Sequence, residues 1–214
     1  MFDKDELIVS EQMLKYMKEK YQEDFTSGLS EEASWAYEYD SMTVFSDKFP
    51  KEFIQVYRYE NNKFRDNYIS YLYRDEVEKI VQEVVEPLFG RCKVINHIST
   101  LPVSVDLPKE ATLNEYLKNQ QPNNQVSIYI KKYDPSKDYM EAVEKMTLQF
   151  KDKILPGIID FYFLSEEKNL DAITRNSEND VLDQADDELW FVKEVHLCYR
   201  ENYEYDRVGL RKML

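Results

Sequence analysis

The sequence predicts a soluble α+β protein of two lobes, and three observations support that class. The chain has 214 residues, a length that suits one large domain or two small ones. Hydrophobic residues make up 43% of it, which is ordinary for a globular protein and sufficient for a core. Apolar residues recur at helical spacing in some segments and alternate in others, as they do in half-buried strands. The order of these segments predicts a helix, an antiparallel meander and a helix, followed by alternating strands and helices.

The first predicted lobe covers residues 1–98. Residues 10–22 predict a helix, because apolar side chains fall at helical spacing after a serine suited to the N-cap. Alternation typical of half-buried strands follows in three stretches, at residues 35–39, 42–46 and 53–59. Residues 60–63 predict a hairpin turn, because asparagine tolerates a left-handed backbone. We expect residues 64–71 to pair back as the next strand.

The most clearly marked element of this lobe is its second helix. Asp75 and Glu78 have the spacing of a capping box, which predicts the start of the helix. Five apolar residues then form one continuous stripe: Val77, Ile80, Val81, Val84 and Leu88. Pro87 and Gly90 predict its end, and residues 92–97 predict a short strand.

Residues 99–111 predict a connector, because they contain Pro102 and Pro108 and have no helical period. The second lobe would then cover residues 112–214 and begin with a helix capped by Thr112 and Glu115. Strands are predicted at residues 126–130, 158–164 and 189–199, and helices at residues 139–150 and 169–174. Residues 158–164 are apolar on nearly both faces, which predicts a central strand. One continuous domain is the alternative to two lobes.

The charge of the chain limits its partners. Lys and Arg total 28 against 42 for Asp and Glu, which gives a net charge of −14. Phosphate backbones and anionic lipid surfaces repel such a protein, so we expect it to bind no nucleic acid. No apolar window is long enough for a membrane span, so no membrane insertion is expected. The printed N-terminus carries no secretory signal, which predicts a cytoplasmic protein; an exported or cell-envelope protein is the alternative if a signal has been removed.

No residue pattern predicts catalysis, a cofactor or a metal. The four glycines are isolated, so a phosphate-binding loop is excluded. Zinc would need Cys92, His97, His196 and Cys198, yet Cys92 and His97 are five residues apart and face opposite ways on a regular strand. The acidic run at residues 178–188 lacks the glycine of a calcium loop. We therefore expect no cofactor and no enzyme, although a hydrolase with paired carboxylates stays open, because such pairs leave little trace in a sequence.

Aromatic residues are abundant, with 17 Tyr, 11 Phe and 2 Trp. Tyrosine is enriched in binding surfaces, where it gives a large contact area at low entropic cost. Aromatic residues also pack well within sheets, so burial in the core is the other interpretation. We predict a non-enzymatic binding or interaction protein, a monomer or weak dimer, that recognises an unknown protein or small ligand. The candidate interaction surface comprises Phe64, Asp66, Tyr68 and Tyr71.

An alternative function follows from the net charge. An acidic immunity-type antagonist would block a basic toxin or nuclease through one acidic face, because opposite charges steer association. The residues of that candidate face are Asp180, Asp183, Asp186, Asp187 and Glu188.

Two sequence stretches resemble a known group of proteins. They read LKYMKEKYQEDF and SDKFPKEFIQVYRYENNKFRDNYISYLYRDEVEKIVQ, within residues 13–82. They are similar to small uncharacterised proteins of low-G+C Gram-positive bacteria, several of which are lipoprotein-like or exported. The resemblance implies relatives on the envelope side of the cell, and it implies no activity.

Overall fold

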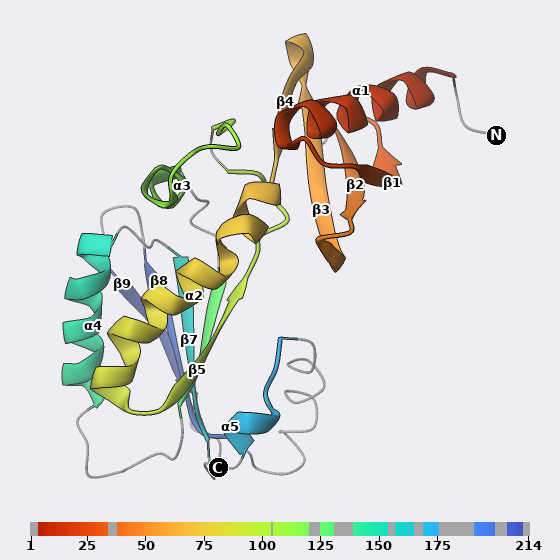
Figure 1. Ribbon diagram of the computed structural model, residues 1–214. Helices are drawn as coiled ribbons and strands as arrows, with labels where there is room; N and C mark the ends of the chain where they lie inside the picture. Colours follow the sequence, from red (N-terminus) through yellow and green to blue (C-terminus); the bar gives the residue numbers. More distant parts are fainter. Residues whose placement is uncertain are drawn as a thin grey trace. The chain divides into compact units, whose positions relative to one another are not determined.

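Two sheets, each accompanied by helices, make up the described part of the chain, and the predicted α+β class is confirmed (Figure 1). This computed structural model describes residues 4–33, 38–103, 105–119, 125–130, 139–153, 157–164, 169–175, 191–199 and 205–211. The chain divides into two compact units. Unit 1 comprises residues 1–73 and 98–121, and unit 2 comprises residues 74–97 and 122–214.

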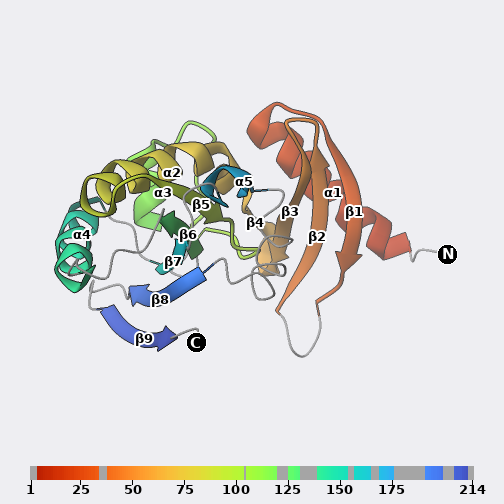
Figure 2. The same ribbon diagram turned by 90° about the horizontal axis from the view of Figure 1, so that it is seen from below.

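Unit 1 is built on a four-stranded antiparallel sheet in the order β1-β2-β3-β4. Its elements are α1 (Lys4–Tyr21), β1 (Phe25–Glu31), β2 (Tyr39–Ser46), β3 (Phe49–Tyr59), the 3-10 turn η1 (Glu60–Asn62), β4 (Lys63–Asp66), the start of α2 (Tyr68–Phe89) and α3 (Leu113–Asn119). Helix α1 lies across one face of this sheet (Figure 2). The predicted strand at residues 35–39 lies mostly outside the described residues.

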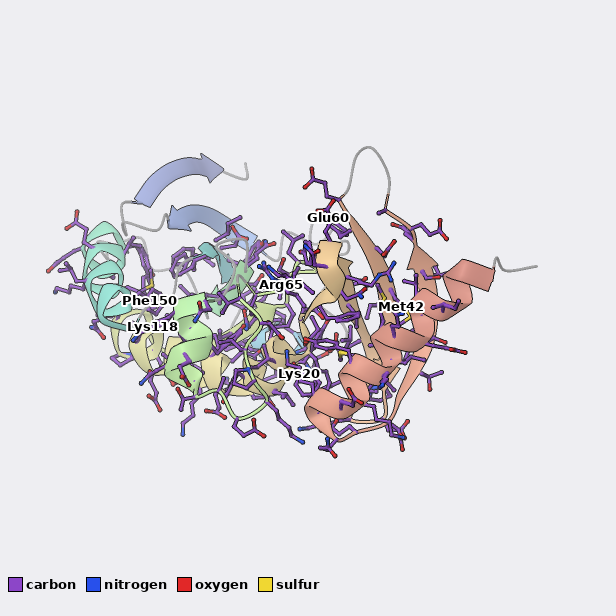
Figure 3. All side chains as sticks on the ribbon, turned by 90° about the horizontal axis from the view of Figure 1, so that it is seen from above. Lys20, Met42, Glu60, Arg65, Lys118 and Phe150 are labelled. Carbon is purple, nitrogen blue, oxygen red and sulfur yellow. The ribbon has the colours of Figure 1, made fainter. Side chains whose placement is uncertain are left out.

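Helix α1 forms because its apolar residues recur at every fourth position. Met13, Met17 and Tyr21 are fully buried and pack on Met42 and other core residues of the sheet, where Figure 3 labels Met42 beside α1. The predicted helix at residues 10–22 is confirmed, although α1 begins earlier, at Lys4. It ends at Tyr21, because Gln22 takes a left-handed backbone with φ of 55°.

The hairpin between β3 and β4 turns where the two asparagines predict it. Asn61 and Asn62 have φ values of 61° and 55°. The prediction of a strand over residues 64–71 is wrong beyond Asp66, where β4 ends. The Asp66 Oδ1 atom accepts the N–H of Tyr68 at 2.8 Å and caps α2. The capping-box pattern at residues 75–78 therefore lies inside α2 and does not start it.

Helix α2 ends close to the predicted position. Pro87 lies in its last turn, and Gly90 follows with φ of 85°, a backbone conformation that glycine adopts without strain. The chain passes from unit 1 to unit 2 within this helix, between Tyr73 and Arg74.

Unit 2 contains a five-stranded sheet in the order β5-β6-β7-β8-β9. Its elements are the rest of α2, β5 (Cys92–His97), β6 (Gln125–Ile130), α4 (Tyr139–Lys153), β7 (Gly157–Leu164), α5 (Asn169–Ala172), β8 (Phe191–Tyr199) and β9 (Tyr205–Arg211). Strands β6 and β7 are parallel and joined through α4, whereas the other neighbours are antiparallel. The predicted central position of β7 is confirmed, and β9 was not predicted.

Different helices pack on the two faces of this sheet. Phe161 of β7 lies 5.2 Å from Phe89 of α2 between ring centroids, and Phe163 lies 4.7 Å from Tyr139 of α4, so both helices cover one face. On the other face Tyr129 packs with residues in and after α5. In the part of the chain that the structure describes, no helix combines the length and apolarity of a membrane span.

Residues 98–121 cluster with unit 1. The Tyr57 hydroxyl donates to the Thr100 carbonyl at 2.8 Å, and the Asn67 amide donates to the Ser99 carbonyl at 3.0 Å. The capping box of α3 is confirmed, because the Thr112 N–H donates to Glu115 at 2.7 Å. Whether lobes 1–98 and 112–214 fold separately about a 99–111 connector stays a prediction.

Candidate functional site

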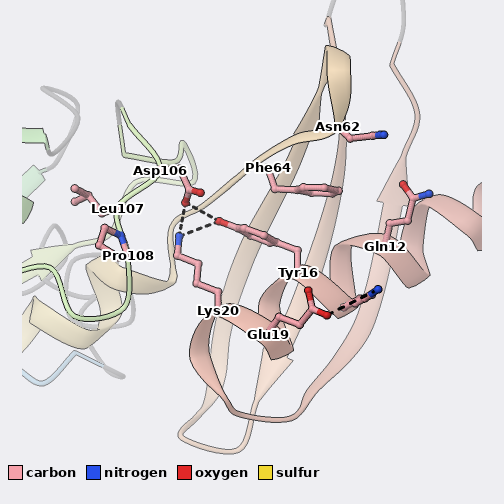
Figure 4. A pocket seen from close by; sticks show the side chains of 10 residues that line it. Gln12, Tyr16, Glu19, Lys20, Asn62, Phe64, Asp106, Leu107 and Pro108 are labelled. Atoms are coloured by element: carbon pink, nitrogen blue, oxygen red, sulfur yellow. Dashed lines mark hydrogen bonds and ion pairs between the residues drawn. The ribbon is translucent and has the colours of Figure 1, made fainter.

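A pocket of about 650 Å³ lies beside α1 in unit 1 (Figure 4). Three separate stretches of the chain line it: one face of α1, the η1–β4 hairpin and the segment before α3. The lining residues are Gln12, Lys15, Tyr16, Glu19, Lys20, Asn62, Phe64, Asp106, Leu107 and Pro108. The volume falls within the range of small-molecule sites, which is about 300–1,000 Å³.

Helix α1 supplies half of the lining through its periodicity. Residues 12, 15, 16, 19 and 20 follow the i, i+3, i+4, i+7, i+8 spacing of one helix face. The fully buried stripe at residues 13, 17 and 21 lies one position further along the chain. The same helix therefore packs one stripe into the core and offers the neighbouring stripe to the pocket.

Two aromatic rings form one wall of the pocket. Tyr16 of α1 and Phe64 of β4 stack with ring centroids 5.0 Å apart and an interplanar angle of 18°. Such pairs contribute about 0.5–1.5 kcal/mol beyond their buried area. Phe64 is only half-buried, so its side chain remains available to a ligand.

The ammonium of Lys20 lies beside Tyr16 and Asp106 in the pocket lining (Figure 4). It donates to the Tyr16 hydroxyl at 2.8 Å, to Asp66 Oδ2 at 2.8 Å and to Asp106 Oδ1 at 2.5 Å. These three acceptors match its three hydrogens, and its side chain is 11% exposed. Lys20 therefore connects α1 to β4 and to the segment before α3.

Asp66 lies behind Lys20 and is fully buried. Its Oδ1 accepts the Tyr21 hydroxyl at 2.7 Å and the Tyr68 N–H at 2.8 Å. Its Oδ2 accepts Lys20 and is 2.8 Å from the Tyr16 hydroxyl. A buried carboxylate is tolerated only when it is paired and hydrogen-bonded, and Asp66 meets both conditions. We call Tyr16, Lys20, Tyr21, Asp66 and Asp106 the Asp66 cluster.

The two tyrosines of the cluster stay protonated. Burial, followed by the negative charge of Asp66, raises the pKa of the Tyr16 hydroxyl and that of Tyr21 far above the usual value. Both hydroxyls are therefore neutral hydrogen-bond donors at physiological pH. Neither is suited to act as a base or a nucleophile.

The four residues of the predicted interaction surface lie in two different environments. Phe64 lines the pocket, and Asp66 supports it from behind. Tyr68 is fully buried, with its ring centroid 4.6 Å from that of Tyr21, and Tyr71 is 7% exposed. The structure gives Tyr68 and Tyr71 a packing role; contact of any of the four with a partner stays a prediction. The five residues of the predicted acidic face lie outside the described residues.

The residues considered for zinc are placed only in part. Cys92 is buried; its burial, with the charge of Glu86, raises the pKa of the thiol to about 12. The Nε2 atom of His97 lies 2.9 Å from the Ser127 hydroxyl. The side chains of His196 and Cys198 lie outside the described set. The predicted absence of a zinc site therefore stays a prediction.

Sequence reasoning missed Tyr16, Lys20 and Asp106. The second stripe of α1 was a usable signal for Tyr16 and Lys20, because residues four apart on a helix lie side by side. Asp106 gave no signal, since it lies in the segment predicted as a connector. Its bond to Lys20 joins residues that are 86 positions apart.

Comparison with known proteins adds little to this site. Protein-family models gave no match, and neither did the curated proteins. Among solved structures, the chain is similar to a DUF5037 family protein from Ruminococcus gnavus ATCC 29149. The two share 14% identity over 92% of this chain and 94% of that one, with a TM-score of 0.46. The family is uncharacterised and the organism is a low-G+C Gram-positive bacterium, but a likeness this weak assigns neither family nor function.

Proposed function

We propose that this is a non-enzymatic binding protein whose pocket beside α1 takes a small organic molecule with an aromatic ring. The observation that carries the proposal is the stacked pair of Tyr16 and Phe64 in the pocket wall. A ligand ring can stack on the half-buried Phe64 side chain and extend the pair. Aromatic rings held in this way contribute both contact area and orientation.

The pocket wall is fixed before any ligand arrives. The Tyr16 hydroxyl is held by Lys20 and by the carboxylates of Asp66 and Asp106, each at 2.8 Å. A wall that is already ordered reduces the entropy lost on binding. This rigidity supports a recognition site.

The chemistry of the lining favours binding over catalysis. The Lys20 ammonium is engaged with three acceptors, so it is no free nucleophile. The raised pKa of Tyr16 keeps its hydroxyl neutral. The other lysine of the lining, Lys15, is a solvated ammonium beside Glu19, and the lining contains no serine, cysteine or histidine to act as nucleophile or base in covalent catalysis.

Ligand-observed NMR with p-cresol and indole as probes tests the proposal. We expect both to bind the wild-type chain with Kd near 1 mM, which is about −4 kcal/mol. Phe64→Ala should weaken both at least tenfold, which corresponds to about 1.4 kcal/mol, the scale of an aromatic pair. Phe53→Ala is the matched control, because Phe53 is 63% exposed and does not line the pocket.

Two results would reject the proposal. One is the absence of probe binding by the wild-type chain. The other is an equal loss of binding in Phe64→Ala and Phe53→Ala, because binding would then occur on any exposed aromatic side chain. Circular dichroism of both variants checks that each still folds.

Three further predictions concern the oligomeric state, the location and the alternative function. A monomer or weak dimer is expected, and light scattering after size exclusion measures it. A cytoplasmic location is expected, with an exported or cell-envelope location as the alternative, and cell fractionation separates them. The acidic antagonist of a basic toxin or nuclease stays the alternative function, resting on the net charge of −14.

A further inference from the structure

We infer that the pocket takes a small aromatic amine in its protonated form, with the ring on Phe64 and the ammonium at Asp106. This inference rests on the proposed function and names its ligand class. It is carried by the charge balance of the Asp66 cluster, by the exposure of Asp106 and by the aromatic wall.

The Asp66 cluster holds more negative than positive charge. Lys20 provides one ammonium, 2.8 Å from Asp66 Oδ2 and 2.5 Å from Asp106 Oδ1. Tyr16 and Tyr21 are neutral, so two carboxylates face a single cation. The five residues of the cluster therefore carry one net negative charge, and Lys109, outside the cluster, donates to the backbone carbonyl of Tyr21 and not to a carboxylate of the described residues.

The remaining charged residues of the lining leave that balance unchanged. Lys15 and Glu19 lie on the same face of α1, 3.8 Å apart between Nζ and Oε1, and their charges offset each other. Both are solvated, with side-chain exposures of 73% and 69%. They supply no desolvated cation that would hold an anionic ligand.

Asp106 is the carboxylate that a ligand can reach. Its side chain is 48% exposed, whereas that of Asp66 is fully buried. Its Oδ1 is bonded to Lys20 and Tyr16, while its Oδ2 has no hydrogen bond to any of the described residues. A carboxylate has about four acceptor positions, so Oδ2 can accept an N–H donor from a ligand.

A cationic ligand also suits the rest of the molecule. Charge-assisted hydrogen bonds are about twice as strong as neutral ones, so an ammonium gains more at Oδ2 than a hydroxyl does. The net charge of −14 raises the local concentration of cations and repels anions. A ligand with its ammonium at Asp106 and its ring on Phe64 would contact both the acidic and the aromatic residues of the lining.

Three probes of similar size and different charge test the ligand class: 2-phenylethylamine, 2-phenylethanol and 3-phenylpropionate. Their affinities are measured by ligand-observed NMR at pH 7, where the amine is protonated. The wild-type chain should bind the amine at least tenfold tighter than the alcohol, and the anion most weakly. Phe64→Ala should weaken the amine and the alcohol alike.

Asp106→Asn is the decisive variant, because it removes the charge and keeps the shape. We expect the affinity of the amine for this variant to fall to within about threefold of the affinity of the alcohol for the same variant, so that the preference for the amine is lost. Asp24→Asn is the matched control, since it removes one negative charge from a side chain that is 88% exposed and outside the pocket. It should preserve the preference for the amine.

The possible failures are distinguishable. If none of the three probes binds, the proposed function fails as well. If the alcohol binds through Phe64 and the wild-type chain shows no preference for the amine, only the amine inference fails. An equal loss of amine and alcohol in Asp106→Asn, or an equal loss of preference in Asp24→Asn, also overturns it. An equal loss of amine and alcohol binding in Asp106→Asn would mean that Asp106 supports the pocket without contacting the ammonium. An equal loss of preference in Asp24→Asn would mean that the net charge of the chain sets the preference.

Discussion

Replacing Asp66 by asparagine tests whether the buried cluster stabilises unit 1. The substitution keeps the shape of the side chain and removes its charge. Oδ1 can still cap α2 at the Tyr68 N–H, but the new amide group donates where Oδ2 accepted Lys20. A buried pair broken at one partner costs about 3–5 kcal/mol. Because Lys20 keeps its 2.5 Å contact with Asp106, we expect the lower value, about 3 kcal/mol.

Thermal unfolding and urea titration measure this loss. A change of 1 kcal/mol corresponds to about 2–4 °C in a domain of 150–250 residues, so Tm should fall by about 6–12 °C. The matched control is Asp24→Asn, which also removes a carboxylate from an ion pair with a lysine. Asp24 lies 2.6 Å from Lys18, but both side chains are largely exposed, so we expect no measurable change in Tm.

Two outcomes would refute the reasoning. Equal Tm values for wild type and Asp66→Asn would mean that the buried carboxylate contributes no net stability. Equal destabilisation by Asp66→Asn and Asp24→Asn would mean that the loss reflects the net charge of the chain and not the cluster. A rise in Tm would mean that the desolvation cost of the charge exceeds the gain from its four partners.

The remaining predictions concern unit 2. Phe161→Ala should lower the free energy of unfolding by about 3–5 kcal/mol, because Phe161 is fully buried in the central strand. The control Leu148→Ala changes a side chain that is 66% exposed on α4, so its free energy of unfolding should stay within about 0.5 kcal/mol of the wild-type value. Urea titrations of both variants check this, and equal effects would contradict it. Cys92 should resist iodoacetamide at pH 9 in the native protein and react in the denatured chain, because burial, then Glu86, raises its pKa from 9.0 to about 12. Since the folded state holds the thiol proton more tightly, the associated stability is complete below pH 9 and is lost between pH 9 and 12. Mass spectrometry of the Cys92 peptide checks this, and rapid native labelling at pH 9 would contradict it.

Predictions from the sequence succeeded where the signal was local. The capping box of Thr112 and Glu115 starts α3, residues 92–97 form β5, and the doubly apolar stretch at 158–164 lies in the middle of its sheet. Each depends on side chains a few residues apart or on the pattern of a single segment. Backbone geometry and local burial decide such features, so neighbouring residues suffice to predict them.

The prediction for the start of α2 was wrong, because two local signals competed. The hairpin turn at residues 60–63 predicts a partner strand over residues 64–71, yet Asp66 accepts the N–H of Tyr68 at the start of a helix. Tertiary packing decided the outcome, since Tyr68 and Tyr71 lie in the core formed with α1. A helix turns both of these residues, three positions apart, toward that core, as one helix face requires.

The sequence alone determined the α+β class, most of the helices and strands, the acidic charge and one residue of the pocket, Phe64. Only the tertiary structure brought Phe64 onto Tyr16 and placed Lys20 between Asp66 and Asp106, which are 40 positions apart in the chain. The physical reason is that local order depends on backbone hydrogen bonds and side-chain period within a segment. A pocket depends on which surfaces pack against each other, and an isolated Lys or Asp carries no mark of its distant partner in the sequence.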